Sequence, residues 1–130
     1  MKKKMSVLLV LLMVFSIAGT CFAGELSFKM KHVDSNSWSP IGNARKDESG
    51  TYGELMITKI YNDKQEESST YFYVKAKATP TGSPDTARKG TWCTLSIPSN
   101  YQAAGDLVPL YCQGNISFLD CYITGYWNVH

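Results

Sequence analysis

Apolar and polar residues alternate with a period of two along several short stretches of this chain. From Glu25 to Val33 the side chains of Leu26, Phe28, Met30 and His32 share one face, and serine and lysine occupy the other. A period of two predicts a strand that is buried on one side. His32 ends the apolar face, where we interpret it as a hydrogen-bonded residue at the edge of the core rather than a metal ligand or catalytic base.

The clearest strand patterns are residues 51–61 and 69–78, which are rich in β-branched and aromatic residues. The predicted inner face of the second strand consists of Phe72, Val74, Ala76 and Ala78, and its predicted outer face of Tyr71, Tyr73, Lys75 and Lys77. Residues 62–68 form a short polar linker, which predicts that the two strands pair as a hairpin.

The rest of the chain alternates between strand patterns and loops, with no helix of ordinary length after residue 23. Strands are predicted at 91–97, 107–112 and 116–129, the last two joined by a short connection, with loops at 34–50 and 79–90. Gly125 is the expected bulge or close-approach point of the last strand. Short strands separated by turn residues indicate a β-sandwich or a small barrel. We predict an all-β, small antiparallel β-sandwich of about six to eight strands, in one domain from residue 24 to 130.

The first 23 residues have the pattern of a signal peptide. A basic start at Lys2, Lys3 and Lys4 precedes a short apolar run, and Ala23 ends a suitable cleavage site. The run is shorter than the roughly 20 residues that a transmembrane helix needs. We therefore predict a secreted protein that is cleaved after Ala23 and has no transmembrane span. Lipidation at Cys21 is the alternative.

Removal of this segment changes the charge of the protein. The remaining chain has ten basic and eleven acidic residues. This near-neutral balance gives no general electrostatic reason to bind nucleic acid or an anionic membrane.

Three cysteines remain after cleavage: Cys93, Cys112 and Cys121. Because an exported chain meets oxidising conditions, and because Cys112 and Cys121 flank the predicted turn, these two are the candidate disulfide. The alternative is three buried thiols that act as small hydrophobic residues.

The sequence lacks the usual catalytic motifs. It contains no Gly-x-Ser-x-Gly, no phosphate-binding loop and no His-Glu-x-x-His. Glu54 and Asp120 are carboxylates that could in principle pair as in a glycosidase, but nothing singles them out. The segment from Asp34 to Asn36 resembles the start of a calcium loop, but the later ligand positions do not match. We therefore predict a protein that is not an enzyme and has no metal or cofactor.

Both ends of the mature chain resemble a known group of proteins. The opening Leu26–Lys31 and the closing Ile123–Trp127 are similar to the ends of a family of small secreted proteins from Gram-positive bacteria, a domain of unknown function. The resemblance implies export and a β-rich fold, but no activity. The layout of the chain is also similar to that of secreted β-sandwich bacteriocins of the lactococcin type.

The candidate binding surface combines the long loop with the outer face of the strand at 69–78. Its residues are Trp38, Tyr71, Tyr73 and Lys75. Aromatic side chains provide contact area and stacking. The sequence therefore favours a module that binds a glycan, a cell wall or a surface protein. A bacteriocin-like antagonist is the alternative, and a matrix component that associates through its sheet edges is a third hypothesis.

Overall fold

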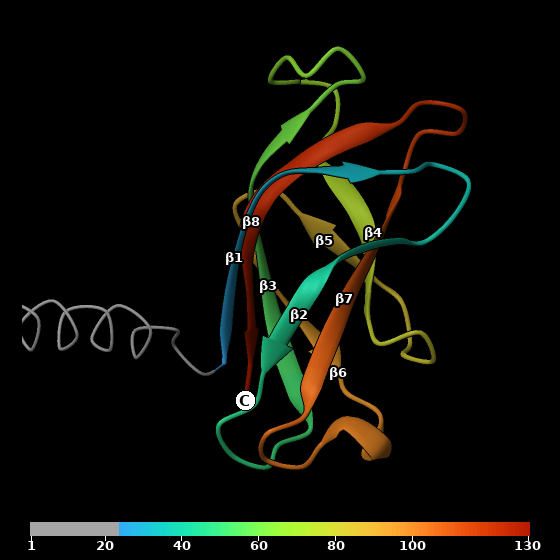
Figure 1. Ribbon diagram of the computed structural model, residues 1–130. Coiled ribbons are helices and arrows are strands. Elements are labelled where there is room, and N and C mark those ends of the chain that lie inside the picture. Colours follow the sequence, from blue (N-terminus) through green and yellow to red (C-terminus); the bar gives the residue numbers. More distant parts are fainter. Residues whose placement is uncertain (1–23) are drawn as a thin grey trace, which may run out of the picture.

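The computed structural model describes residues 24–130, which form eight strands and one short 3₁₀ turn (Figure 1). The signal peptide, its cleavage after Ala23 and the alternative lipidation at Cys21 lie outside the described residues. The strands are β1 (Glu25–Val33), β2 (Ser39–Arg45), β3 (Tyr52–Tyr61), β4 (Tyr73–Ala78), β5 (Asp85–Arg88), β6 (Trp92–Ser96), β7 (Leu107–Gly114) and β8 (Cys121–Val129), and the 3₁₀ turn covers Ser99–Tyr101.

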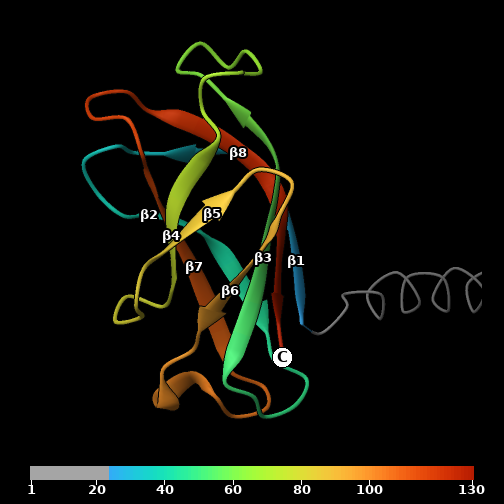
Figure 2. The same cartoon turned by 180° about the vertical axis from the view of Figure 1, so that it is seen from behind.

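The strands form two antiparallel sheets that pack face to face. Sheet A has the order β1-β8-β3-β6, and sheet B has the order β2-β7-β4-β5. Figures 1 and 2 show the two layers from opposite sides. The predicted all-β sandwich is therefore confirmed.

The core lies between the two sheets and is centred on Trp127 of β8. This indole is completely buried, and its Nε1 donates a hydrogen bond of 3.0 Å to the main-chain oxygen of Val108 in the opposite sheet. Gly53 of β3 lies under the ring, where a Cβ atom would overlap it. The inner positions predicted for most of β4 are correct, because Val74, Ala76 and Ala78 are all buried. In the predicted strand at 91–97, the alternate residues Cys93, Leu95 and Ile97 are buried as well.

Two predicted strand pairings are wrong. β3 belongs to sheet A and β4 to sheet B, so residues 51–61 and 69–78 do not form a hairpin. β7 and β8 are likewise in different sheets, and residues 116–120 form a loop before β8. A period of two reveals which face of a strand is buried, but not the sheet in which its partner lies.

Two strands lie where the sequence predicted loops. β2 falls within 34–50, and β5 falls within 79–90. β2 contains Pro40, Gly42 and Asn43, which are typical of loops, and β5 has four residues with one buried side chain. Both are edge strands, which tolerate such residues because one side of the strand has no pairing partner in the sheet.

A bulge interrupts the alternation predicted for β1. Met30 has a φ of 50°, and the register with β8 shifts between Phe28 and Lys31. The N–H of Met30 bonds to Thr124 Oγ1 at 3.1 Å instead of continuing the main-chain ladder. Val33 is consequently the buried residue at the end of the strand, and His32 is exposed.

Candidate binding surface

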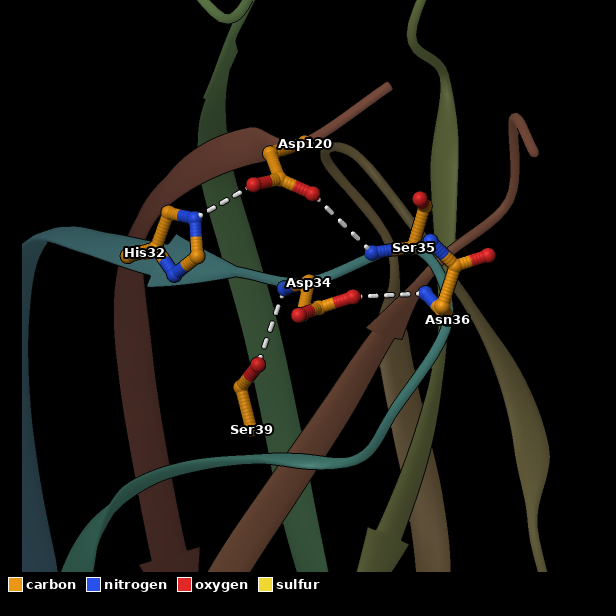
Figure 3. A network of polar contacts seen from close by, with 6 residues as sticks. All are labelled: His32, Asp34, Ser35, Asn36, Ser39 and Asp120. Carbon is orange, nitrogen blue, oxygen red and sulfur yellow. Dashed lines mark hydrogen bonds and ion pairs between the residues drawn. The ribbon is translucent and has the colours of Figure 1, made fainter. Parts of the chain in front are cut away.

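The loop before β2 is tied to the end of β1 and to the residue that precedes β8 (Figure 3). Asp120 accepts the main-chain N–H of Ser35 at 3.3 Å through Oδ1, and its Oδ2 lies 2.9 Å from His32 Nε2. The N–H of Gly114 at the end of β7 bonds to the main-chain oxygen of Asp34. The prediction that His32 is hydrogen-bonded is thus confirmed. These contacts fix the loop to both sheets.

The same loop is shaped by its own short side chains. Asp34 Oδ1 accepts the N–H of Asn36 at 2.7 Å, and Ser39 Oγ accepts the N–H of Asp34 at 2.8 Å. The bond from Asn36 is the main cause that lowers the pKa of the Asp34 carboxyl. Such turns satisfy the main chain locally. They set the direction of the chain before Trp38, which follows directly.

Trp38 packs on the outer face of sheet B. The ammonium group of Lys77 lies 4.5 Å from the centroid of its ring, and the same group donates to the main-chain oxygen of Pro80 at 2.9 Å. One strand away, the guanidinium of Arg88 lies 5.3 Å from the ring centroid of Tyr73. Each contact is a cation–π arrangement that holds a charged side chain in place.

These pairs belong to a continuous basic and aromatic surface. Lys75 lies between them on β4, opposite Gln113 of β7 and Thr86 of β5. We call the set Trp38, Tyr73, Lys75, Lys77 and Arg88 the basic aromatic surface.

The outer face of sheet B carries charge of one sign. Its outward strand positions include Lys75, Lys77, Arg88 and Arg45, and no acidic residue. The nearest acid, Asp85 at the start of β5, borders a hollow of about 280 Å³ beside Lys75. Sheet A has a mixed outer surface with exposed residues of both signs, among them Glu25, Lys29, Lys31 and Lys59. The outward strand positions of sheet B are therefore basic without any acid, whereas those of sheet A carry both signs.

Three of the four residues predicted for binding lie on this surface, and one does not. Trp38, Tyr73 and Lys75 are together, whereas Tyr71 is only 5% exposed. Its neighbour Phe72 is 57% exposed instead of buried. The reason is that β4 begins at Tyr73, so the alternation does not extend back to these two residues. Burial also raises the pKa of the Tyr71 hydroxyl.

Arg88 was not predicted from the sequence. It lies in β5, which the sequence pattern placed inside a loop. Its position opposite Tyr73 depends on the pairing of β4 with β5, and no local signal in the sequence reveals that register.

The predicted disulfide between Cys112 and Cys121 is absent, because Cys93, Cys112 and Cys121 are free thiols in the structure. The prediction assumed that Cys112 and Cys121 flank the turn of a hairpin, but they lie on β7 and β8 in opposite sheets. Both side chains are completely buried. Burial raises the pKa of Cys121 to about 12 and raises that of Cys112 further, with a second contribution there from Cys121.

Because these thiols are buried, we predict that the free energy of unfolding decreases at alkaline pH. In the unfolded chain they ionise near pH 9, whereas in the folded chain they stay protonated to a higher pH. Their contribution to stability is therefore complete below pH 9 and decreases above it, by about 1.4 kcal/mol per thiol for each pH unit. Because burial also raises the pKa of Cys93, we expect Cys112→Ala to remove between a third and a half of the thiol-dependent loss between pH 9 and 10, as measured by urea unfolding. An unchanged pH slope in this variant would contradict the prediction.

The structure does not bring Glu54 and Asp120 together as a catalytic pair. Asp120 precedes β8, whereas Glu54 is opposite Asn128 near the other end of that strand. At about 3.3 Å per residue the two carboxylates are roughly 25 Å apart, too far for a glycosidase pair. Glu54 contacts His130 at 3.0 Å instead. Among residues 24–130, no group of three or more His, Cys, Asp and Glu side chains is arranged to hold a metal ion.

No helix in residues 24–130 has the length and apolar character needed to cross a membrane. Comparisons of the chain with models of protein families, with curated proteins and with solved structures found no match.

Proposed function

We propose that this chain is a secreted, non-enzymatic module that binds an anionic polysaccharide of a cell surface or cell wall through the basic aromatic surface. The observation that carries the proposal is the set of basic residues on the outer face of sheet B, which has no acid at its outward strand positions. Its outward strand positions hold four basic residues and no acidic one, although the domain as a whole is nearly neutral.

The arrangement of these side chains supports a polymer as the ligand. The cationic groups of Lys77 and Arg88 are held against Trp38 and Tyr73, so little conformational entropy is lost when they meet an anion. A sheet face is broad and gently twisted, and it offers contacts to several successive units of a chain. Aromatic rings beside the charges provide surfaces on which sugar rings can stack. Charge and stacking together favour an anionic sugar polymer over a simple anion.

The loop network supports a preformed surface. Asp120 fixes the loop through Ser35, and Asp34 shapes the turn before Trp38. The indole is therefore placed before any ligand arrives, which lowers the cost of binding.

The direct test is retention on immobilised polysaccharides. The panel consists of polygalacturonate, hyaluronan and purified wall of a Gram-positive bacterium, with dextran and fully methyl-esterified polygalacturonate as neutral controls. We expect retention on at least one anionic polymer, little on the neutral ones, and weakening by added salt, which screens exposed charges. Retention on none of the anionic polymers, or equal retention on the neutral ones, would overturn the proposal.

A triple variant tests the surface itself. Replacing Lys75, Lys77 and Arg88 by glutamine is expected to weaken binding to the retained polymer about 30-fold, because each exposed charge contributes about 0.5 to 1 kcal/mol. The measurement is a binding isotherm at fixed ionic strength.

The matched control makes the same change of charge on sheet A. It replaces Lys29, Lys31 and Lys59, which are exposed, by glutamine. If both triple variants weaken binding equally, net charge alone is responsible and sheet B is not the binding face.

A further inference from the structure

A groove opens where the edge strands of the two sheets meet. β5 is the last strand of sheet B and β6 the last strand of sheet A, and a short turn connects them (Figure 2). The groove has a volume of about 250 Å³. Its lining consists of Asp85, Thr86, Arg88, Thr91, Trp92, Cys93 and Thr94.

The lining combines one aromatic ring with many hydrogen-bonding groups. Trp92 is 51% exposed, which leaves the indole accessible from the groove. Asp85 provides a carboxylate whose Oδ1 accepts the N–H of Thr86 at 2.7 Å, and Arg88 provides a planar set of donors. Three threonines, Thr86, Thr91 and Thr94, line the same groove. An aromatic ring can stack on the apolar C–H face of a sugar ring, and the donors and acceptors beside it can bond to the hydroxyl groups at the edge of that ring.

The size of the groove limits what it can hold. Pockets for drug-sized ligands begin at about 300 Å³, so a smaller groove suits a single ring. The groove also adjoins the basic aromatic surface, since Arg88 belongs to both. Asp85 and Thr86 border this groove and the hollow beside Lys75 alike.

We propose that the groove between β5 and β6 binds one sugar unit of the polysaccharide, stacked on Trp92 and hydrogen-bonded by Asp85 and Arg88. This inference rests on the proposed function and adds a specific subsite to it. The sheet face attracts the polymer by charge, and the groove recognises the sugar itself.

The rate at which Cys93 is alkylated reports on occupation of the groove alone. It lines the groove and is 8% exposed, whereas Cys112 and Cys121 are completely buried. We measure the rate at which iodoacetamide alkylates Cys93 in the purified protein, located by peptide mapping. The probes are galacturonate, glucuronate, N-acetylglucosamine, glucose and galactose.

We expect at least one of these sugars to slow alkylation of Cys93 at least fivefold at saturation. Trp92→Ala is expected to weaken that sugar's affinity about tenfold, as the loss of a stacked ring predicts. Trp92→Phe should retain most of the affinity, and Trp38→Ala, which changes only the sheet face, should leave it unaltered.

The outcomes separate the two proposals. If the polymer is retained but no sugar protects Cys93, the subsite is wrong and the sheet-face function stands. If a sugar protects Cys93 but no polymer is retained, the groove is a sugar site and the proposed function fails. Protection by a mixture of short peptides and by no sugar would assign the groove to a peptide strand added at the sheet edges, and would overturn the inference.

Discussion

Trp127→Ala is expected to lower the free energy of unfolding by about 4 kcal/mol, within the range of buried tryptophan truncations. The indole is completely buried on the central strand β8 and lies over Gly53. Its loss leaves a cavity between the sheets. It also leaves the main-chain oxygen of Val108 without the donor that crosses from the opposite sheet. Because domains of this size are stable by only about 5 to 15 kcal/mol, the variant should lose a large fraction of the stability of the fold.

The measurement is urea unfolding followed by far-ultraviolet circular dichroism. Trp92→Ala is the matched control, because it removes the same side chain from a position that is 51% exposed. It should cost less than about 1 kcal/mol. Trp127→Phe keeps a ring but not the N–H, so it should fall between the two. Equal losses for Trp127→Ala and Trp92→Ala would show that Trp127 is not the centre of the core.

The face that each strand buries was largely predictable from the sequence. In β6, Cys93 and Leu95 alternate with exposed Trp92 and Thr94 as the pattern indicates. The fold class follows from such patterns, since several half-buried strands must cover one another. The exceptions have local causes, such as the bulge at Met30, which moves the buried position from His32 to Val33.

Strand pairing was not predictable, and two other errors followed from it. The short linkers suggested local hairpins, but the chain crosses between the sheets after β3 and again after β7. The connections observed, residues 62–72 and 115–120, are long enough to bridge packed sheets about 10 Å apart, so a short linker does not decide between these paths. The incorrect pairing of β7 with β8 was also the basis for the candidate disulfide, which the structure does not contain, and the unrecognised β5 concealed Arg88.

The basic aromatic surface also depends on both local and long-range information. Loop composition and alternation identified Trp38, Tyr73 and Lys75 from the sequence. Total charge gave no indication of a basic face, because it sums both faces of the molecule. The complete basic face appears only when β4 and β5 are placed side by side in sheet B, with Arg88 opposite Tyr73.

Gly125→Ala is the second substitution with a large expected effect, about 3 kcal/mol of lost stability. Gly125 lies in the middle of β8, opposite Phe28 on one side and Ile57 on the other. A Cβ atom there would overlap the main-chain oxygen of Met56 and lie 3.1 Å from the Cα of Ile57. The main-chain atoms of a central strand are held by neighbours on both sides, so they cannot move aside as a side chain can. The expected close approach at Gly125 is thus confirmed.

Gly42→Ala is the control for this prediction, because the two glycines differ in what surrounds them. At Gly42 the nearest atoms belong to the side chain of Leu26, which is partly exposed and can change its rotamer. We expect a cost below about 1 kcal/mol there, measured by the same urea unfolding. The register of β1 and of β3 shifts beside Gly125, so the glycine lets both neighbours bend around β8. If both variants lose the same stability, the main-chain contact at Gly125 does not constrain sheet A.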